Sequence, residues 1–166
     1  MQIRLAETAG FCFGVERAVA LAEQTARTCK NAVTLGPIIH NRHVVERFER
    51  LGLHEISSAE EAEPGQTVVI RAHGIPVSEQ RMLSARGAAA VDATCPFVKK
   101  IHVIAQKAER DGRSLLIIGT PTHPEVAAIA SYSSDAHVFQ TAEALQAWLT
   151  ERPDRRDLPF CLVSQT

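Results

Sequence analysis

Short apolar runs alternate with longer amphipathic segments along almost the whole chain of 166 residues. Several of the runs are rich in β-branched residues, as buried strands are. We predict strands at residues 3–6, 32–35, 67–71, 88–91, 114–119, 136–139 and 158–163. Between them, apolar residues recur three and four positions apart, which is the spacing of a helix with one buried face. This period predicts helices at residues 15–28, 44–51, 76–86, 96–110, 126–130 and 142–149.

Strands and helices that alternate with short links predict an α/β fold with mainly parallel sheets flanked by helices. The order of strand, polar junction residue and helix recurs loosely along the chain. We therefore expect two similar small units, residues 1–93 and 94–166. Their lengths are near the lower limit for independent folding, so we expect them to rest on each other and share a cleft.

The charge balance gives no general attraction to nucleic acids or anionic membranes. Lysine and arginine total 18, aspartate and glutamate total 19, and the net charge is −1. No run approaches the roughly 20 apolar residues of a membrane span, and the N-terminus lacks the pattern of a secretion signal. We therefore expect a soluble cytoplasmic protein without nucleic-acid or membrane partners, whose four cysteines do not form disulfides.

Two cysteines lie where a predicted strand turns into a predicted helix. Cys12 stands between Gly10 and Gly14, and Cys95 directly precedes Pro96, which suits the first turn of a helix. The free N–H groups and the dipole of a following helix favour a thiolate, so each cysteine is placed to act as a ligand or a nucleophile. The alternative for an isolated Gly-x-Cys-x-Gly is a plain turn whose thiol packs as a small apolar group.

Three histidines and one glutamate share this junction context. They are His40, next to the possible helix cap Asn41, and then His73, His123 and Glu125. Because ligands bind at the carboxyl edge of parallel sheets, we expect these side chains and the two cysteines to converge. The thiolates could share a soft metal or an iron–sulfur cluster, the imidazoles suit a phosphate-bearing ligand, and a carboxyl group could move protons.

The remaining cysteines and histidines lack the repeated junction context. We interpret Cys29, at a helix end, and Cys161, inside an apolar strand, as structural. We expect the other histidines to be exposed or satisfied by ordinary hydrogen bonds; they are His43, His54, His102 and His137.

Six separated motifs resemble one enzyme family. They are GFCFGVERA from Gly10, GPIIHN from Gly36, RAHG from Arg71, DATCP from Asp92, HPEV from His123 and SQT at the end. Their order and spacing resemble the 4-hydroxy-3-methylbut-2-enyl diphosphate reductase family, which forms isopentenyl and dimethylallyl diphosphate at the end of the methylerythritol phosphate route. The resemblance covers the whole chain and corresponds to about the first half of the family's usual length.

The resemblance implies a role for each junction residue. Cys12 and Cys95 match two of three cysteine ligands of a [4Fe-4S] cluster, and the histidines match those that hold the substrate's diphosphate. Glu125 matches the acid that supplies a proton as the substrate's hydroxyl leaves as water. The family's electrons come from ferredoxin or flavodoxin, and its fold has three α/β units arranged with pseudo-symmetry, of which this chain matches two.

The chain also departs from the family pattern. By the resemblance, the third cysteine ligand and the substrate-contacting threonine lie beyond Thr166, so we expect the 166-residue chain alone to be inactive. Ala128 and Ser131 stand where the family usually has glycines. Two other functions stay open: a non-catalytic module that binds a diphosphate or another anion, and a hydrolase that pairs Cys12 with a histidine. The hydrolase leaves Cys95 and two histidines unexplained.

Overall fold

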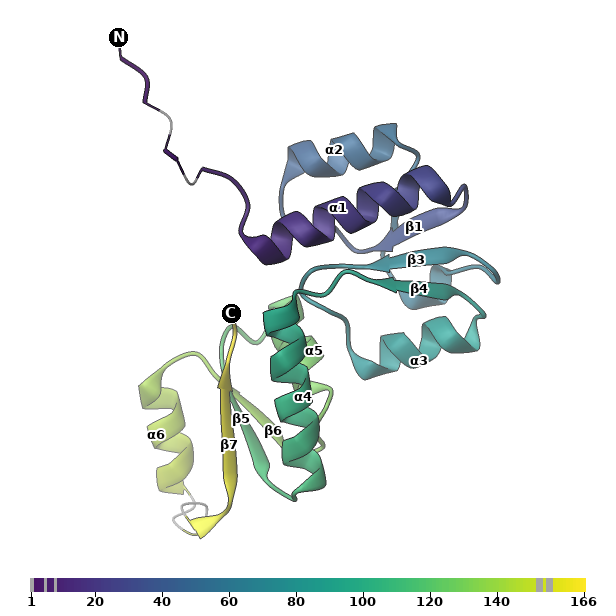
Figure 1. The fold of residues 1–166 in the computed structure, drawn as a ribbon. Helices are drawn as coiled ribbons and strands as arrows, with labels where there is room; N and C mark the ends of the chain where they lie inside the picture. Colours follow the sequence, from purple (N-terminus) through teal and green to yellow (C-terminus); the bar gives the residue numbers. More distant parts are fainter. Residues whose placement is uncertain (1, 5, 8, 152–153, 155–156) are drawn as a thin grey trace.

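The computed structural model describes residues 2–4, 6–7, 9–151, 154 and 157–166. Its strands form two parallel sheets, one of four strands in the order β2-β1-β3-β4 and one of three in the order β6-β5-β7 (Figure 1). Helices flank both sheets. The predicted α/β class with parallel sheets is therefore confirmed, while the division into units at residues 93 and 94 stays a prediction.

The first sheet is built from the segment between residues 32 and 92. Its strands are β1 (Ala32–Leu35), β2 (His54–Ile56), β3 (Thr67–Ile70) and β4 (Ala89–Asp92). Helices α1 (Phe13–Thr28) and α2 (Arg42–Arg50) cover one face, and α3 (Val77–Ala85) with the short 3-10 helix η1 (Ala59–Glu61) covers the other.

The central strand β3 shows why these strands are apolar at nearly every position. Val69 packs in the core with α1 and α2, whereas its neighbours Val68 and Ile70 pack with α3 and η1. Successive side chains of a strand point to opposite faces, and here helices bury both faces. A continuous apolar run is therefore the correct signal for a strand of this sheet.

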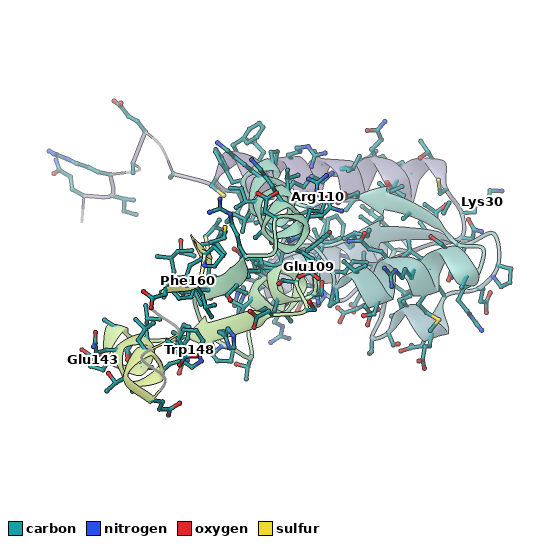
Figure 2. All side chains as sticks on the ribbon, turned by 90° about the horizontal axis from the view of Figure 1, so that it is seen from below. Lys30, Glu109, Arg110, Glu143, Trp148 and Phe160 are labelled. Atoms are coloured by element: carbon teal, nitrogen blue, oxygen red, sulfur yellow. The ribbon has the colours of Figure 1, made fainter. Side chains whose placement is uncertain are left out.

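The second sheet contains β5 (Ser114–Ile118), β6 (Ala136–Phe139) and β7 (Phe160–Ser164). Helices α4 (Pro96–Arg110) and α5 (Pro124–Ala130) share its main apolar core. Helix α6 (Ala142–Glu151) lies on the other side, where Trp148 contacts the rings of Phe139 and Phe160 (Figure 2). None of the helices among the described residues is long and apolar enough to cross a bilayer.

Most predicted elements exist within a few residues of their predicted bounds, and two corrections concern strands. The prediction of a strand at 3–6 is wrong for the described residues of that segment; Leu5 lies outside them. Ile3 is 80% exposed, and the segment extends away from both sheets, where it has no strand to pair with (Figure 1). Strand β2 was not predicted, because it is only three residues long and His54 and Glu55 are exposed at the sheet edge.

Candidate functional site

Three histidine rings from three separate loops form one row. His40 follows β1, His73 follows β3, and His123 follows β5 in the other sheet. The ring centroids of His40 and His73 are 5.2 Å apart with nearly parallel planes, and those of His73 and His123 are 5.1 Å apart and nearly perpendicular. The structure thus brings the three predicted histidines together at the carboxyl ends of strands from both sheets.

Backbone hydrogen bonds connect the loops that carry these residues. The N–H of Ala72 donates to the carbonyl of Ile38 at 3.3 Å, and the N–H of Cys95 donates to the carbonyl of Ala72 at 2.9 Å. These hydrogen bonds therefore hold the His40 loop, the His73 loop and the start of α4 next to one another. Asn41 caps α2 by accepting a hydrogen bond from Val44 N at 3.3 Å, as the sequence suggested.

His73, in the middle of the row, is held in the neutral form. Burial, with a smaller contribution from the nearby His123, His40 and Arg71, lowers the pKa of His73 to about 4. Its Nδ1 is buried and has no hydrogen-bond partner among the described residues. A buried polar atom without a partner lowers stability. An anion bound against the row would offset the unfavourable interaction of a protonated His73 with its positive or ionisable neighbours.

Glu125 is 2% exposed and lies beside this row, as the second residue of α5. Its Oε1 accepts from the backbone N–H of Thr166 at 2.7 Å, and its two carboxylate oxygens accept from the Thr166 hydroxyl at 2.9 and 3.0 Å. The N–H of Glu125 donates to Nδ1 of His123 at 3.2 Å. Because Nδ1 accepts, a neutral His123 ring carries its proton on Nε2, which stays available as a donor.

The two predicted cysteine ligands occupy equivalent positions. Cys12 is the N-cap of α1 and Cys95 is the N-cap of α4, and neither thiol caps its helix through a hydrogen bond. A Cβ added at Gly14 would overlap Cys95 Sγ, so the absence of a side chain there lets the two helix starts approach closely. Arg17 strengthens this contact by donating to the carbonyl of Thr94 at 3.2 Å.

The remaining cysteines lie away from this contact. Cys29 is at the opposite end of α1 from Cys12, and Cys161 packs against the core of the second sheet. All four cysteines are free thiols in the structure.

The donor set accommodates only part of an iron–sulfur cluster. Two thiols at neighbouring helix starts suit a soft metal. Among the residues that the structure describes, however, no group of three histidine, cysteine, aspartate or glutamate side chains is arranged to hold a metal ion. We therefore derive no reaction step through a cluster from these residues.

Sequence reasoning missed two residues at or near the site. The sequence marks Thr166 only as the last residue of the SQT motif, and its contact with Glu125 was not predicted. His102 was expected to be exposed or satisfied, but it is 7% exposed and its Nε2 has no partner among the described residues. Its spacing from the buried Val98 and Ala105 of α4 places it on the apolar face and could have shown its burial. The other three histidines are half-buried or exposed, as expected: His43, His54 and His137.

Fold and site together define an α/β protein whose candidate ligand-binding side chains gather at the carboxyl ends of parallel strands. The sequence model described as LytB protein matches residues 3–166, so the chain belongs to the LytB protein family.

Curated relatives and solved structures agree with this assignment. A 4-hydroxy-3-methylbut-2-enyl diphosphate reductase of Nitratiruptor is 40% identical over 88% of this chain and 52% of its own length. The protein of the same name from Solidesulfovibrio magneticus is 44% identical over the whole chain and 59% of its own length. This chain thus spans about half the length of the curated relatives it matches.

Two solved structures have the same fold. One is described as (E)-4-hydroxy-3-methyl-but-2-enyl diphosphate reductase, the terminal enzyme of the non-mevalonate pathway; it is 38% identical, with a TM-score of 0.80 over 99% of this chain and 58% of that one. The other, a Plasmodium falciparum reductase, is 25% identical, with a TM-score of 0.80 over 96% of this chain and 50% of that one.

Proposed function

We propose that this chain forms the diphosphate-binding part of a cytoplasmic 4-hydroxy-3-methylbut-2-enyl diphosphate reductase, which yields isopentenyl and dimethylallyl diphosphate. The observation that carries the proposal is the row of three histidines beside a buried glutamate. Histidines from both sheets would hold one ligand, and each sheet would belong to one of the two units, 1–93 and 94–166. The names of the relatives support this choice of substrate.

The row of histidines would hold the diphosphate. The centroids of neighbouring rings in the row are 5.1 to 5.2 Å apart for His40, His73 and His123. This spacing lets several N–H groups converge on the oxygens of one anion. Nδ1 of His73 has no hydrogen-bond partner in the part of the chain that the structure describes, and a phosphate oxygen or a bridging water would satisfy it when the ring carries its proton there. Charge-assisted hydrogen bonds of this kind contribute about 1.5–3 kcal/mol each.

Glu125 would supply a proton to the substrate's hydroxyl, which then leaves as water. The Thr166 hydroxyl donates to both carboxylate oxygens and so fixes their orientation. Burial of the carboxyl group keeps bulk water from competing for the proton. A positioned acid of this kind contributes about 10²–10⁴-fold to a rate.

Cys12 and Cys95 would be two ligands of a [4Fe-4S] cluster, with a third cysteine from the part of the relatives' length that this chain does not span. When bound, such a cluster would supply electrons received from ferredoxin or flavodoxin. The support is the placement of both thiols at neighbouring helix starts.

The test is anaerobic reconstitution of the full-length gene product with iron and sulfide, followed by an assay of allylic diphosphate reduction with a chemical electron donor. The proposal requires visible iron–sulfur absorption and formation of both products. Replacing Cys12 or Cys95 by serine should abolish the absorption, whereas the Cys29→Ser control should retain it. Turnover by an enzyme without a cluster would refute the proposal.

One observation favours a second function, a non-catalytic module that binds a diphosphate or another anion. The described residues contain the histidine row but no group of three histidine, cysteine, aspartate or glutamate side chains arranged to hold a metal ion. This function predicts inorganic diphosphate binding by the full-length product with no iron–sulfur absorption after reconstitution, so the same experiment separates the two.

A further inference from the structure

A second contact between the helices of the two sheets lies at the far end of α5. The hydroxyl of Ser131 accepts a hydrogen bond from the N–H of Val77 at 3.0 Å, and Gln80 Nε2 donates to the hydroxyl of Tyr132 at 3.0 Å. Val77 is the first residue of α3, and the preceding cap residue, Pro76, offers no side-chain acceptor. The start of α3 has no side-chain acceptor of its own. The hydroxyl of Ser131, which follows α5 beside the other sheet, supplies this acceptor.

The buried ring of His102 fills the space between this contact and the histidine row. Its centroid is 4.9 Å from that of Tyr132. On its other side, a Cβ added at Gly74 would lie 2.6 Å from His102 Cε1, and Gly74, directly after His73, has a φ of +74°. His102 thus packs against the turn that carries His73. We call Ser131, Tyr132 and His102 together the joint.

The joint and the histidine row contact opposite ends of the same helix. His123 is the N-cap of the seven-residue helix α5 and Ser131 is its C-cap, while Val77 is the first residue of α3 and His73 lies four residues before it. The helix is about 10 Å long, so a tilt of about 6° would move one end by about 1 Å relative to the other. The apolar core of the second sheet holds α5, and contacts with the other sheet's segments at both ends restrict its tilt relative to α3 more than one contact would.

We propose that Ser131, Tyr132 and His102 are positioning residues that set the spacing between His73 and His123, so that the histidine row fits one diphosphate. The consequence for binding rests on the proposed function, whereas the consequence for ring spacing does not. Ser131 is the most informative residue to change. Threonine at this position keeps the hydroxyl, and valine of nearly the same shape removes it.

The first measurement needs no ligand. In a histidine-labelled chain, nuclear Overhauser contacts between the rings of His73 and His123 should be strong for the parent and for Ser131→Thr, and clearly weaker for Ser131→Val. Ser133→Ala is the matched control, because the Ser133 hydroxyl donates to Glu109 at 3.0 Å and accepts from the N–H of Asp135 at 3.2 Å, and neither partner belongs to α3. An unchanged ring contact in the folded valine variant would overturn the proposal.

The second measurement is the affinity for inorganic diphosphate by calorimetry. Ser131→Val should weaken binding about three- to tenfold, with rescue by threonine, since one bond of a coupled contact is lost. In a His123→Ala background the valine change should have no further effect, and an equal loss in both backgrounds would overturn the proposal. A parent protein that does not bind diphosphate would refute the proposed function. The ring contact between His73 and His123 would still test the positioning role of the joint.

Tyr132→Phe provides a second variant should the valine variant not fold. It removes the acceptor for Gln80 and keeps the ring beside His102. We expect a smaller loss of the ring contact between His73 and His123, in the same direction. A ring contact of parental strength in this variant would then overturn the proposal.

Discussion

Acidification should lower the free energy of unfolding of this protein through protonation of His73. A His73→Gln variant should not show this part of the loss. The pKa of His73 is lowered from 6.5 to about 4 by burial and by its positive or ionisable neighbours. The unfolded chain takes up a proton at His73 as the pH falls below about 6.5, whereas the folded protein does so only near 4. Stability is therefore lost over this window as the pH falls, and no further loss from His73 follows below it.

The full shift corresponds to about 3 kcal/mol. The ring is only partly buried, so solvent screening reduces the expected effect to about 1–2 kcal/mol. The assay is urea unfolding of both proteins at about pH 7 and about pH 4.5. Carboxylates remote from the site titrate in both proteins, so the difference between their pH dependences reports His73 together with its interactions with the neighbouring rings.

The exposed His43 provides the matched control, since replacing it by glutamine should leave the parental pH dependence intact. Inorganic diphosphate, if it binds the row, should reduce the acid-dependent loss, because a bound anion favours the protonated ring. If His73→Gln loses as much stability as the parent between the two pH values, the reasoning is refuted.

Three further predictions concern the site. Glu125→Gln in the full-length enzyme should retain diphosphate binding and lower turnover by about 10²–10⁴-fold, because only the proton donor is lost; turnover at the parental rate would contradict the assigned role. His40→Ala should weaken binding of inorganic diphosphate by about 1.5–3 kcal/mol in calorimetry if its hydrogen bond is charge-assisted, with His43→Ala unchanged as the control. Gly14→Ala should lower the free energy of unfolding in urea by about 1–3 kcal/mol, since the added methyl group would displace Cys95 Sγ; a variant as stable as the parent would show that this contact is not close.

The sequence by itself predicted parallel sheets covered by helices and the three histidines that gather at their carboxyl edges. Continuous apolar runs such as the one at β3 are possible only where both faces of a strand are buried, so they indicate a parallel sheet covered by helices. A polar residue in the short link between such a run and the next helix lies near the carboxyl edge of the sheet. His40, His73 and His123 could therefore be placed together before the structure was known.

Local pattern could not predict features that depend on contacts between distant segments. Residues 3–6 have the composition of a strand, but a strand also needs a neighbouring strand for its hydrogen bonds. Strand β2 is the reverse case: two of its three residues are exposed, so its sequence does not resemble a buried strand, but its pairing with β1 makes it a strand.

Tertiary structure alone decided the chemical state of the site. The low pKa of His73 depends on burial and on rings brought from two other loops, and the orientation of Glu125 depends on Thr166, 41 residues away along the chain. The burial of His102 with an unpartnered nitrogen likewise results from the packing of α4 against Gly74 and Tyr132. Burial and charge interactions act through space, so residue types and their spacing along the chain predict which groups meet but not the environment that each group then experiences.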